Sequence, residues 1–257
     1  MQISIEFLGT GTSQGVPVIA CDCQVCKSND PHDRRLRTSA LVRTGGSNLL
    51  IDAGPDLRQQ MLRSNVRELD AVLLTHEHMD HVAGIDDLRS FNFSQQRAMD
   101  IYANAATITA VKRMYHYAFA EERYPGTPEL RLHEIGEGPF TIGNVPIVPI
   151  EVMHYKLPVL GFRIGGLAYI TDAKSIAESE LRKLRGVDVL VLNALRQKKH
   201  ISHFNLEEAI ALVGKVEPRR ALFIHISHLM GLHEEVAAHL PKGIELAFDG
   251  QVVQVAG

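Results

Sequence analysis

The segment 75–84 reads THEHMDHVAG and places three histidines and an aspartate within six positions. It directly follows the apolar run 72–74, which predicts a buried strand that ends at the cluster. In an extended segment His76 and His78 lie on the same side, so their imidazole nitrogens can bind one metal ion. Asp80 and His81 come where the chain turns into a helix predicted at 81–90, and they can hold a second ion.

This cluster differs from the helical His-Glu-x-x-His motif of metalloproteases, because position 80 is aspartate. The alternative is a solvated polar turn. Four coordinating side chains immediately after a buried strand argue against that alternative.

More groups of the same kind follow other predicted strands. Asp52 ends the run NLLID, His154 follows VPIEVM, Asp172 follows AYIT, and His225 follows ALFI. Functional side chains are usually found on loops that a rigid scaffold holds in place. We therefore expect one open site built from the ends of several strands.

The three cysteines, Cys21, Cys23 and Cys26, lie within six residues. An odd and tightly bunched set is a poor disulfide framework. Thiolates favour tetrahedral zinc, and a closed zinc site would need a fourth ligand. The alternative is three ordinary reduced thiols.

Short apolar runs bounded by turn residues predict the strands that position these groups. Hairpin turns are expected at 45–47, 143–144, 165–166 and 249–250. Apolar spacing near three and four predicts helices at 55–64, 104–122, 177–185, 205–216 and 232–240. Asn205, followed by Glu208, is expected to cap one of them. Hairpins with interleaved helices favour a layered sandwich with the helices outside.

Length and charge narrow the class of protein. A chain of 257 residues with 45% hydrophobic content can form one large core, and we predict a single domain over 1–257 with a cysteine-bearing loop at about 18–30. A net charge of −3 gives no general basic field for nucleic acid. The N-terminus does not read as a signal peptide, and no apolar run reaches the roughly 20 residues that span a bilayer. We expect a cytoplasmic protein.

The pattern Thr75-His76-x-His78-x-Asp80-His81-x-x-Gly84 resembles the signature of the metallo-β-lactamase superfamily. The resemblance extends over nearly the whole chain. The opening LGTGTSQGVPVIACDCQVC narrows it to the branch that contains a cyclic phosphodiesterase and ribonuclease Z. It implies an α/β fold, an αββα sandwich of two mixed sheets flanked by helices, with a two-metal site on one edge.

The resemblance also implies how the ligands divide between two divalent ions, zinc or manganese. The first ion would take His76, His78 and His154. The second would take Asp80, His81 and His225. Asp172 would bridge them. Because position 78 is histidine rather than glutamate, the oxygen-reducing di-iron branch is disfavoured.

The same branch pairs a cysteine loop with a histidine like His228, three residues beyond His225. The resemblance therefore implies one structural zinc held by Cys21, Cys23, Cys26 and His228.

Three residues are expected to act in catalysis: Asp172, His203 and Asp52. His203, in ISHFNLEEA, resembles the family's general acid or phosphate contact, and an unperturbed pKa of about 6.5 suits that task. The alternative is a surface histidine, the reading we also favour for His200. Asp52 is expected to support the metal site by hydrogen bonds, or else to stabilise the bend at Gly54 and Pro55.

The favoured function is a dinuclear-metal phosphodiesterase acting on a small sugar or nucleoside phosphate, cyclic phosphates included. Two ions can lower the pKa of water to about 7 and bind a phosphoryl oxygen. One alternative is an ester, thioester or lactone hydrolase. Another is an RNA 3′-end nuclease, whose best-known form carries an arm between the positions of His154 and Asp172, where this chain has a short gap. We expect a small phosphodiester as partner, no membrane and no long nucleic acid; the resemblance is compatible with a homodimer.

Three weaker patterns complete the sequence. GTGTSQG at 9–15 predicts a turn lining a pocket, because it lacks the spacing of a nucleotide loop. DRRLRTS at 33–39 predicts an exposed basic face, with a contact to an anion as the alternative. The tyrosines of 106–128, Tyr115 and Tyr117 among them, are at helical spacing typical of core, with a lid as the alternative.

Overall fold

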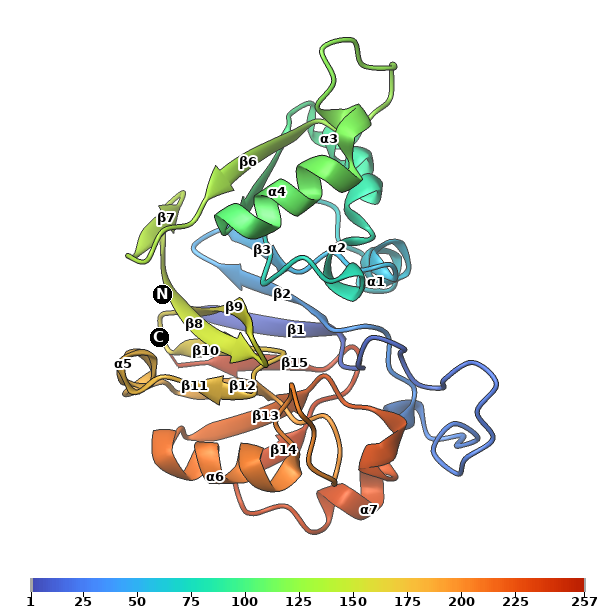
Figure 1. Ribbon diagram of the computed structural model, residues 1–257, viewed down its shortest axis with the longest axis vertical. Helices are drawn as coiled ribbons and strands as arrows, with labels where there is room; N and C mark the ends of the chain where they lie inside the picture. The colour runs from blue at the N-terminus through green and yellow to red at the C-terminus, as the bar shows by residue number, and fades with distance from the viewer. Residues whose placement is uncertain (1, 257) are drawn as a thin grey trace.

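The computed structural model describes residues 2–256, and its strands form two sheets packed face to face with helices on their outer sides (Figure 1). Each sheet buries one face against the other sheet and its second face against helices, which is a stable way to cover apolar surface on both sides. The predicted αββα sandwich of the α/β class is confirmed.

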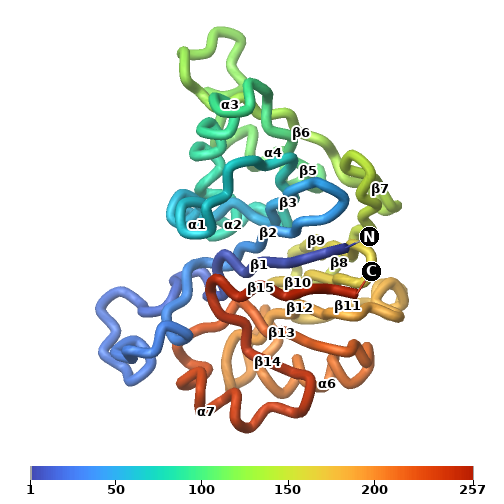
Figure 2. Tube along the Cα trace, turned by 180° about the vertical axis from the view of Figure 1, so that it is seen from behind, coloured from blue at the N-terminus to red at the C-terminus, as the bar shows by residue number. Residues whose placement is uncertain are grey.

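The first sheet mixes an antiparallel half, β15 to β3, with a parallel half, β3 to β6. Its strands lie in the order β15 (Val252–Val255), β1 (Ile3–Gly9), β2 (Ser39–Thr44), β3 (Ser47–Ile51), β4 (Ala71–Leu73), β5 (Met99–Ala103) and β6 (Leu130–Glu134). β1 and β15 come from opposite ends of the described chain and lie side by side (Figure 2).

The second sheet is antiparallel at β8 to β10 and parallel from β10 onwards. Its order is β11 (Ser175–Ile176), β8 (Val145–His154), β9 (Leu157–Ile164), β10 (Leu167–Ile170), β12 (Val189–Asn193), β13 (Arg220–Ile224) and β14 (Ile244–Leu246), and β7 (Phe140–Ile142) pairs with β8. Because β10, β12 and β13 run parallel, their carboxyl ends meet at one edge.

The helices divide between the two outer faces. The first sheet is covered by α1 (Leu57–Arg63), α2 (Met79–Val82), α3 (Arg89–Gln95) and α4 (Ala105–Met114), with η2 (Ile85–Leu88) and η3 (His116–Ala118). The second is covered by α5 (Glu178–Leu181), α6 (Leu206–Val216) and α7 (His233–Ala237), with η4 (Arg182–Leu184). Two short turns, η1 (Pro31–Asp33) and η5 (His228–Met230), lie in loops. Between residues 2 and 256, no helix is both long enough and apolar enough to cross a membrane.

Alternation along the strands sends side chains into different apolar layers. In β1, Ile5 and Phe7 join the layer between the sheets, whereas Leu8 joins the layer under the helices of the first sheet. In β12, Val191 lies between the sheets and Leu192 beneath α6. Burying each such side chain contributes about 1.5–3 kcal/mol. These layers hold the two sheets, and therefore their edges, in a fixed relation.

Local turn chemistry predicted three of four hairpins. The turns at 45–46, 143–144 and 165–166 join β2 to β3, β7 to β8 and β9 to β10, as predicted. The hairpin predicted at 249–250 is wrong, because β14 pairs with β13 and β15 crosses to β1 in the other sheet. The carboxylate of Asp249 accepts the backbone N–H groups of Thr10 (2.9 Å) and Leu36 (2.8 Å), which holds this segment against the first sheet.

The helix predicted over 104–122 is shorter than expected. The α-helix ends at Met114, and a short 3₁₀ turn follows before the chain leaves helical geometry. The hydroxyl of Tyr115 donates to the Val82 carbonyl oxygen at 2.8 Å, and that of Tyr117 donates to Asp86 Oδ1 at 2.6 Å. These two side-chain hydrogen bonds join the chain after Met114, where the prediction had the helix continue, to the segment 82–86.

The helix predicted at 205–216 is confirmed, with Asn205 and Glu208 forming a capping box. The exposed basic face predicted at 33–39 is wrong for Arg35, which is 5% exposed and donates from Nη1 to Thr10 Oγ1 at 2.8 Å. A charged side chain is buried here because acceptors from distant segments surround it, and periodicity cannot reveal them.

Candidate metal centre and active site

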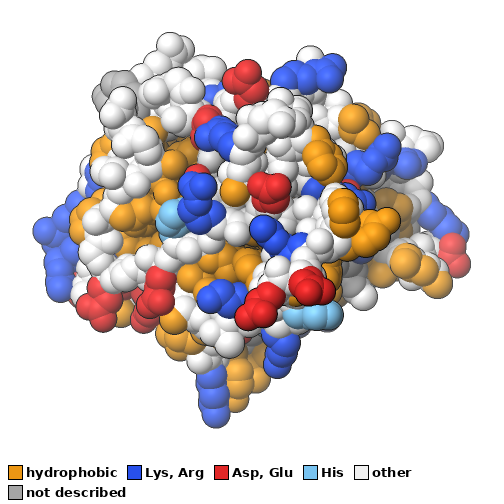
Figure 3. Space-filling view, turned by 90° about the horizontal axis from the view of Figure 1, so that it is seen from above, with side chains coloured by type: hydrophobic (Ala, Val, Ile, Leu, Met, Phe, Trp, Pro, Cys, Tyr) orange, Lys and Arg blue, Asp and Glu red, His pale blue; other side chains and the backbone are white. Residues whose placement is uncertain are grey.

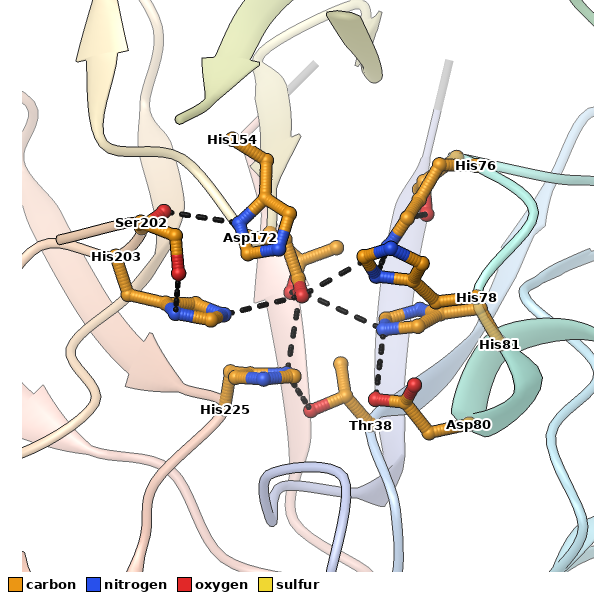
Figure 4. A network of polar contacts seen from close by, with 12 residues as sticks. Thr38, His76, His78, Asp80, His81, His154, Asp172, Ser202, His203 and His225 are labelled. Carbon is orange, nitrogen blue, oxygen red and sulfur yellow. Dashed lines mark hydrogen bonds and ion pairs between the residues drawn. The ribbon is translucent and has the colours of Figure 1, made fainter. Parts of the chain in front are cut away.

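The seven side chains predicted to bind two ions lie together where both sheets end (Figure 4). Those of the first sheet follow β4; in the second sheet one ends β8 and the others follow β10 and β13. The strand ends meet because parallel neighbours finish at the same edge and the apolar layer between the sheets aligns the two edges. The structure thus brings these distant chain segments to one place.

Asp172 lies at the centre of the group and is almost fully buried. Its Oδ2 lies 3.2 Å from His203 Nε2 and 3.8 Å from His76 Nε2. Its Oδ1 lies 3.2 Å from His225 Nδ1 and 3.5 Å from His81 Nε2. Burial opposes the charged carboxylate, but the imidazoles of His225 and His81 hold the pKa of Asp172 well below its ordinary value. A negative charge is thus fixed in the middle of a ring of nitrogens.

The set predicted for the second ion is compact. Ligand atoms of Asp80, His81, Asp172 and His225 all lie within 4.8 Å of one another. Nε2 of His81 is buried and lies 3.1 Å from Asp80 Oδ2 and 3.5 Å from Asp172 Oδ1, although within the described chain it makes no well-aligned hydrogen bond. Burial opposes a charged His81, yet the carboxylates of Asp172 and Asp52 raise its pKa well above the ordinary value. The pocket therefore favours positive charge, and its nitrogen and oxygen donors fit a divalent ion.

The set predicted for the first ion is less uniform. Ligand atoms of His76, His78 and Asp172 lie within 4.8 Å of one another. His154 instead groups with Asp172 and His203, although its ring centroid is only 5.2 Å from that of His78. The structure thus brings His154 to the site and places it between the first set and His203.

Three of these histidine rings are held by a partner at Nδ1. The pairs are His81 with Asp52 Oδ2 at 2.6 Å, His76 with Thr75 Oγ1 at 3.0 Å, and His154 with the Ser202 carbonyl oxygen at 2.9 Å. These acceptors assign a hydrogen to each Nδ1. Nε2 of each ring is then the nitrogen left to face the site, which is the arrangement expected around a metal ion.

Asp52 supports this arrangement from behind. Its fully buried carboxylate accepts the backbone N–H of Thr75 at 2.8 Å, the Thr75 hydroxyl at 2.8 Å and the His81 ring. It contacts a predicted ligand, rather than serving only the bend at Gly54 and Pro55. Its backbone φ of 62° lies in the left-handed region, as do those of Asp172 (56°) and His225 (55°). Such conformations cost about 1–3 kcal/mol for residues with a side chain and cluster at functional sites.

Gly84 of the histidine motif has a steric role. A Cβ at this position would lie 2.1 Å from the carbonyl oxygen of Gly54, and a Cβ on Gly54 would lie 2.1 Å from that of Asp80. The two glycines let the loop after β3 touch the start of α2. This close approach brings Asp52 within reach of His81.

His203 is buried beside the predicted ligands. Its Nε2 points to Asp172, and its ring stacks on that of His225 with centroids 5.0 Å apart and 15° between planes. The alternative of a surface histidine is therefore wrong for His203. His200, which was expected at the surface, is half-buried, and its Nδ1 lies 3.1 Å from Nδ1 of His203.

Two further residues contact the site and were not predicted from the sequence. Thr12 Oγ1 lies 3.2 Å from His225 Nε2, and Thr38 Oγ1 lies 3.3 Å from His225 Nδ1. Thr12 belongs to the glycine-rich turn predicted to line a pocket, which was the available signal. Thr38 lies within the segment 33–39, which was predicted to be exposed, so no local pattern indicated it.

The three cysteines and His228 form a second cluster. Nδ1 of His228 lies 3.3 Å from Cys21 Sγ, 3.3 Å from Cys23 Sγ and 3.5 Å from Cys26 Sγ. The N–H of Cys26, together with His228, lowers the pKa of Cys23 to about 6, whereas burial raises that of Cys26 to about 11. Three sulfurs and one nitrogen at this spacing fit a tetrahedral zinc.

The segment 106–128 divides into two parts. Tyr115 is buried and Tyr117 is bonded to Asp86, as expected of core residues. Tyr124 is 82% exposed. A lid that includes Tyr115 would have to break the bond to Val82.

We predict that Asp52→Asn lowers the affinity of the centre for zinc or manganese about 10- to 100-fold. The amide presents one acceptor in place of two and disturbs the hydrogen bond that orients His81. Competition with a chromogenic chelator measures the affinity. The matched control is Asp188→Asn, because Asp188 directly precedes the amino end of β12, opposite the edge where the predicted ligands lie. This variant should bind metal like the unmodified protein. Equal affinity in the Asp52 and Asp188 variants would contradict the supporting role of Asp52.

A second prediction concerns the cysteine cluster. Purified protein should carry about one zinc that survives mild chelation, and both His228→Ala and Cys23→Ser should lose it, because a closed site needs all four ligands. Elemental analysis after dialysis against a chelator gives the count. The exposed His239→Ala should retain the ion. Full retention of tight zinc in the His228 and Cys23 variants would rule out the site.

Comparison with known proteins places this geometry in a family. A family model described as the beta-lactamase superfamily domain matches residues 47–226, which include all seven predicted ligands. Among solved structures, a diphosphatase from the PhnP family is 38% identical, with a TM-score of 0.93 over 99% of this chain and 97% of that one.

Two curated relatives carry different names. The octanoyltransferase of Porphyromonas gingivalis is 44% identical over 247 residues, which are 95% of this chain and 50% of that protein. The ribonuclease Z of a Bradyrhizobium species is 35% identical over 129 residues, 49% of this chain and 38% of the relative. The chain thus spans half the length of the first and less of the second. On its family match and its fold, the chain belongs to the metallo-β-lactamase superfamily of metal-dependent hydrolases and is similar to the PhnP family within it.

Proposed function

We propose that the protein hydrolyses small phosphate diesters with the help of two divalent ions, zinc or manganese. The observation that carries the proposal is the place of His203. Its Nε2 lies 3.2 Å from Asp172, inside the group of predicted ligands. A proton donor beside a strongly charged centre suits departure of an alkoxide from phosphorus.

The donor sets suggest how the ions would be held. Asp80, His81 and His225 would hold one ion, His76, His78 and His154 the other, with Asp172 between them. When bound, such ions supply positive charge to phosphoryl oxygens and bring the pKa of water to about 7.

The side chains themselves would perform the remaining tasks. His203 would donate the hydrogen on Nε2 to the departing oxygen, and its stacking on His225 keeps that nitrogen directed at the site. Asp172 would keep its charge, since the surrounding imidazoles favour the carboxylate. Asp52 would orient His81 through the 2.6 Å contact.

A small substrate is supported by the surroundings of the site. Residues 155–171, all of them described, form a short turn, β9, the turn to β10 and β10, with no inserted arm. One face of the molecule, seen from above in Figure 3, intersperses basic, acidic and apolar side chains rather than carrying a broad basic surface for a long nucleic acid. A diphosphate diester is included in the class, because the similar PhnP-family structure is that of a diphosphatase.

A substrate panel tests the proposal. The metal-loaded protein should hydrolyse bis(p-nitrophenyl) phosphate and at least one cyclic nucleoside phosphate or diphosphate diester. It should leave lactones, nitrocefin and precursor transfer RNA essentially intact. Strong ester cleavage without diesterase activity would reverse the order of the two classes.

Thioester hydrolysis is the second candidate, and the 44% identity to an octanoyltransferase favours it. This chain matches half of that protein, so the named activity can belong to the other half. An octanoyl thioester therefore joins the panel. Turnover of that thioester above turnover of every phosphodiester would make this the better assignment.

We predict that His203→Ala lowers turnover of a diester with an alkoxide leaving group about 10²- to 10⁴-fold. The loss should be far smaller for a p-nitrophenolate, which departs without a proton. Steady-state kinetics on both substrates, with metal content measured in parallel, check this. A variant that retains full turnover would remove His203 from the mechanism, and one that has lost metal would make it a ligand instead.

A further inference from the structure

His200 touches His203 on the side away from Asp172. Its Nδ1 lies 3.1 Å from Nδ1 of His203, while Nε2 of His203 faces Asp172 at 3.2 Å. The Ser202 hydroxyl completes a triangle, with Oγ 3.1 Å from Nδ1 of His203 and 3.2 Å from Nδ1 of His200. His203 is thus held between a polar pair on one side and the site on the other.

The backbone decides which nitrogen carries a hydrogen. The N–H of Ser202 donates to Nδ1 of His200 at 3.3 Å. That nitrogen is therefore an acceptor, and a neutral His200 carries its hydrogen on Nε2. Its contact with Nδ1 of His203 is then favourable only when His203 supplies the hydrogen. The reverse assignment would set two lone pairs against each other at 3.1 Å.

The surroundings favour a neutral and well-placed His200. Burial, and then the charges of His203 and Arg196, lower the pKa of His200. Arg196 fixes the preceding loop by donating to the carbonyl oxygens of Lys198 (3.2 Å) and Lys199 (2.9 Å). The chain that leads to His200 is thus tied to Arg196, and the ring itself is in contact with Ser202 and His203.

We propose that His200 is a positioning residue for His203: it accepts the Nδ1–H of His203 and so leaves Nε2 as the nitrogen that faces Asp172 and the substrate. This rests on the proposed function, in which His203 gives a proton to the leaving oxygen. The ring that acts as the acid is the imidazolium, with Nδ1–H held by His200 and Nε2–H directed at Asp172 Oδ2. The proton that departs comes from Nε2, and the neutral ring left behind is the Nδ1–H tautomer that His200 binds. No proton has to leave or join Nδ1 of His203 during the step.

The same loop joins two groups of the site. The carbonyl oxygen of Ser202 accepts Nδ1–H of His154, and its N–H and hydroxyl contact His200. Loop 200–203 therefore sets the orientation of His154 and His203 together. His200 is the one of these histidines with no contact to Asp172 in the described structure, which separates its role from ligand binding.

Two isosteric variants test the proposal. His200→Asn keeps an acceptor, Oδ1, near the position of Nδ1, whereas His200→Leu has the same branching and no acceptor. Each is made alone and with Ser202→Ala, so that the hydroxyl cannot replace the lost group. On a 2′,3′-cyclic nucleoside phosphate, whose leaving group is an alkoxide, His200→Leu should lower kcat about 10-fold, with KM and metal content unchanged. On bis(p-nitrophenyl) phosphate it should stay within about 2-fold, and His200→Asn should resemble the unmodified protein on both.

A double-mutant cycle excludes a general structural effect. In a His203→Ala background, His200→Leu should have no further effect on the cyclic phosphate. An equal loss on both substrates, or the same loss without His203, would overturn the proposal.

A readout without substrate separates this proposal from the proposed function. Long-range ¹H–¹⁵N spectra of zinc-loaded protein with labelled histidines report which ring nitrogens carry hydrogen. His203 should have Nδ1–H in the unmodified protein and in His200→Asn, and should shift toward the Nε2–H tautomer in His200→Leu with Ser202→Ala. An unchanged tautomer in that variant would overturn the proposal. If the unmodified protein hydrolyses no diester, the proposed function fails, and the spectra still decide whether His200 anchors His203.

Discussion

Four histidine rings surround the buried carboxylate of Asp172, and this fixed negative charge is the feature on which the site depends. An isolated buried carboxylate would take up a proton, because burial opposes its charge. Here His225 and His81 keep its pKa well below the ordinary value. The result is a pocket whose donors and central charge favour cations. Nε2 of His81 faces two carboxylates, those of Asp80 and Asp172, which together favour positive charge at the same place.

That arrangement can exist only because two sheets are locked together. The nitrogens of His76 and His81 belong to the first sheet, whereas Asp172 and His225 belong to the second. The apolar layer containing Phe7 and Phe162 fixes the sheets against each other, so that their strand ends meet. The segment from His225 to His228 then joins the site to the cysteine cluster, three residues further on. The position of the cysteine loop and the position of His225 are therefore coupled through this short segment.

Many features of the fold and of the site could be predicted from local sequence patterns. Strand ends, three hairpins and the Asn205 cap depend on residues a few positions apart, so the sequence carries them directly. The seven predicted ligands were identifiable because each follows a buried strand or sits in a dense motif. The errors at Arg35 and Asp249 have one cause: these residues obey no local period and find partners in distant segments.

The sequence by itself determined the types of donor, their positions at strand ends and the family they resemble, because these properties are set by nearest neighbours and by spacing. Only the tertiary structure decided which nitrogen faces the site and what holds each ring. Thr12 and Thr38 meet His225 across 213 and 187 positions of chain, and His200 reaches His203 only through the path of a loop. Contacts of this kind arise from packing of the whole chain, which no short window of sequence contains.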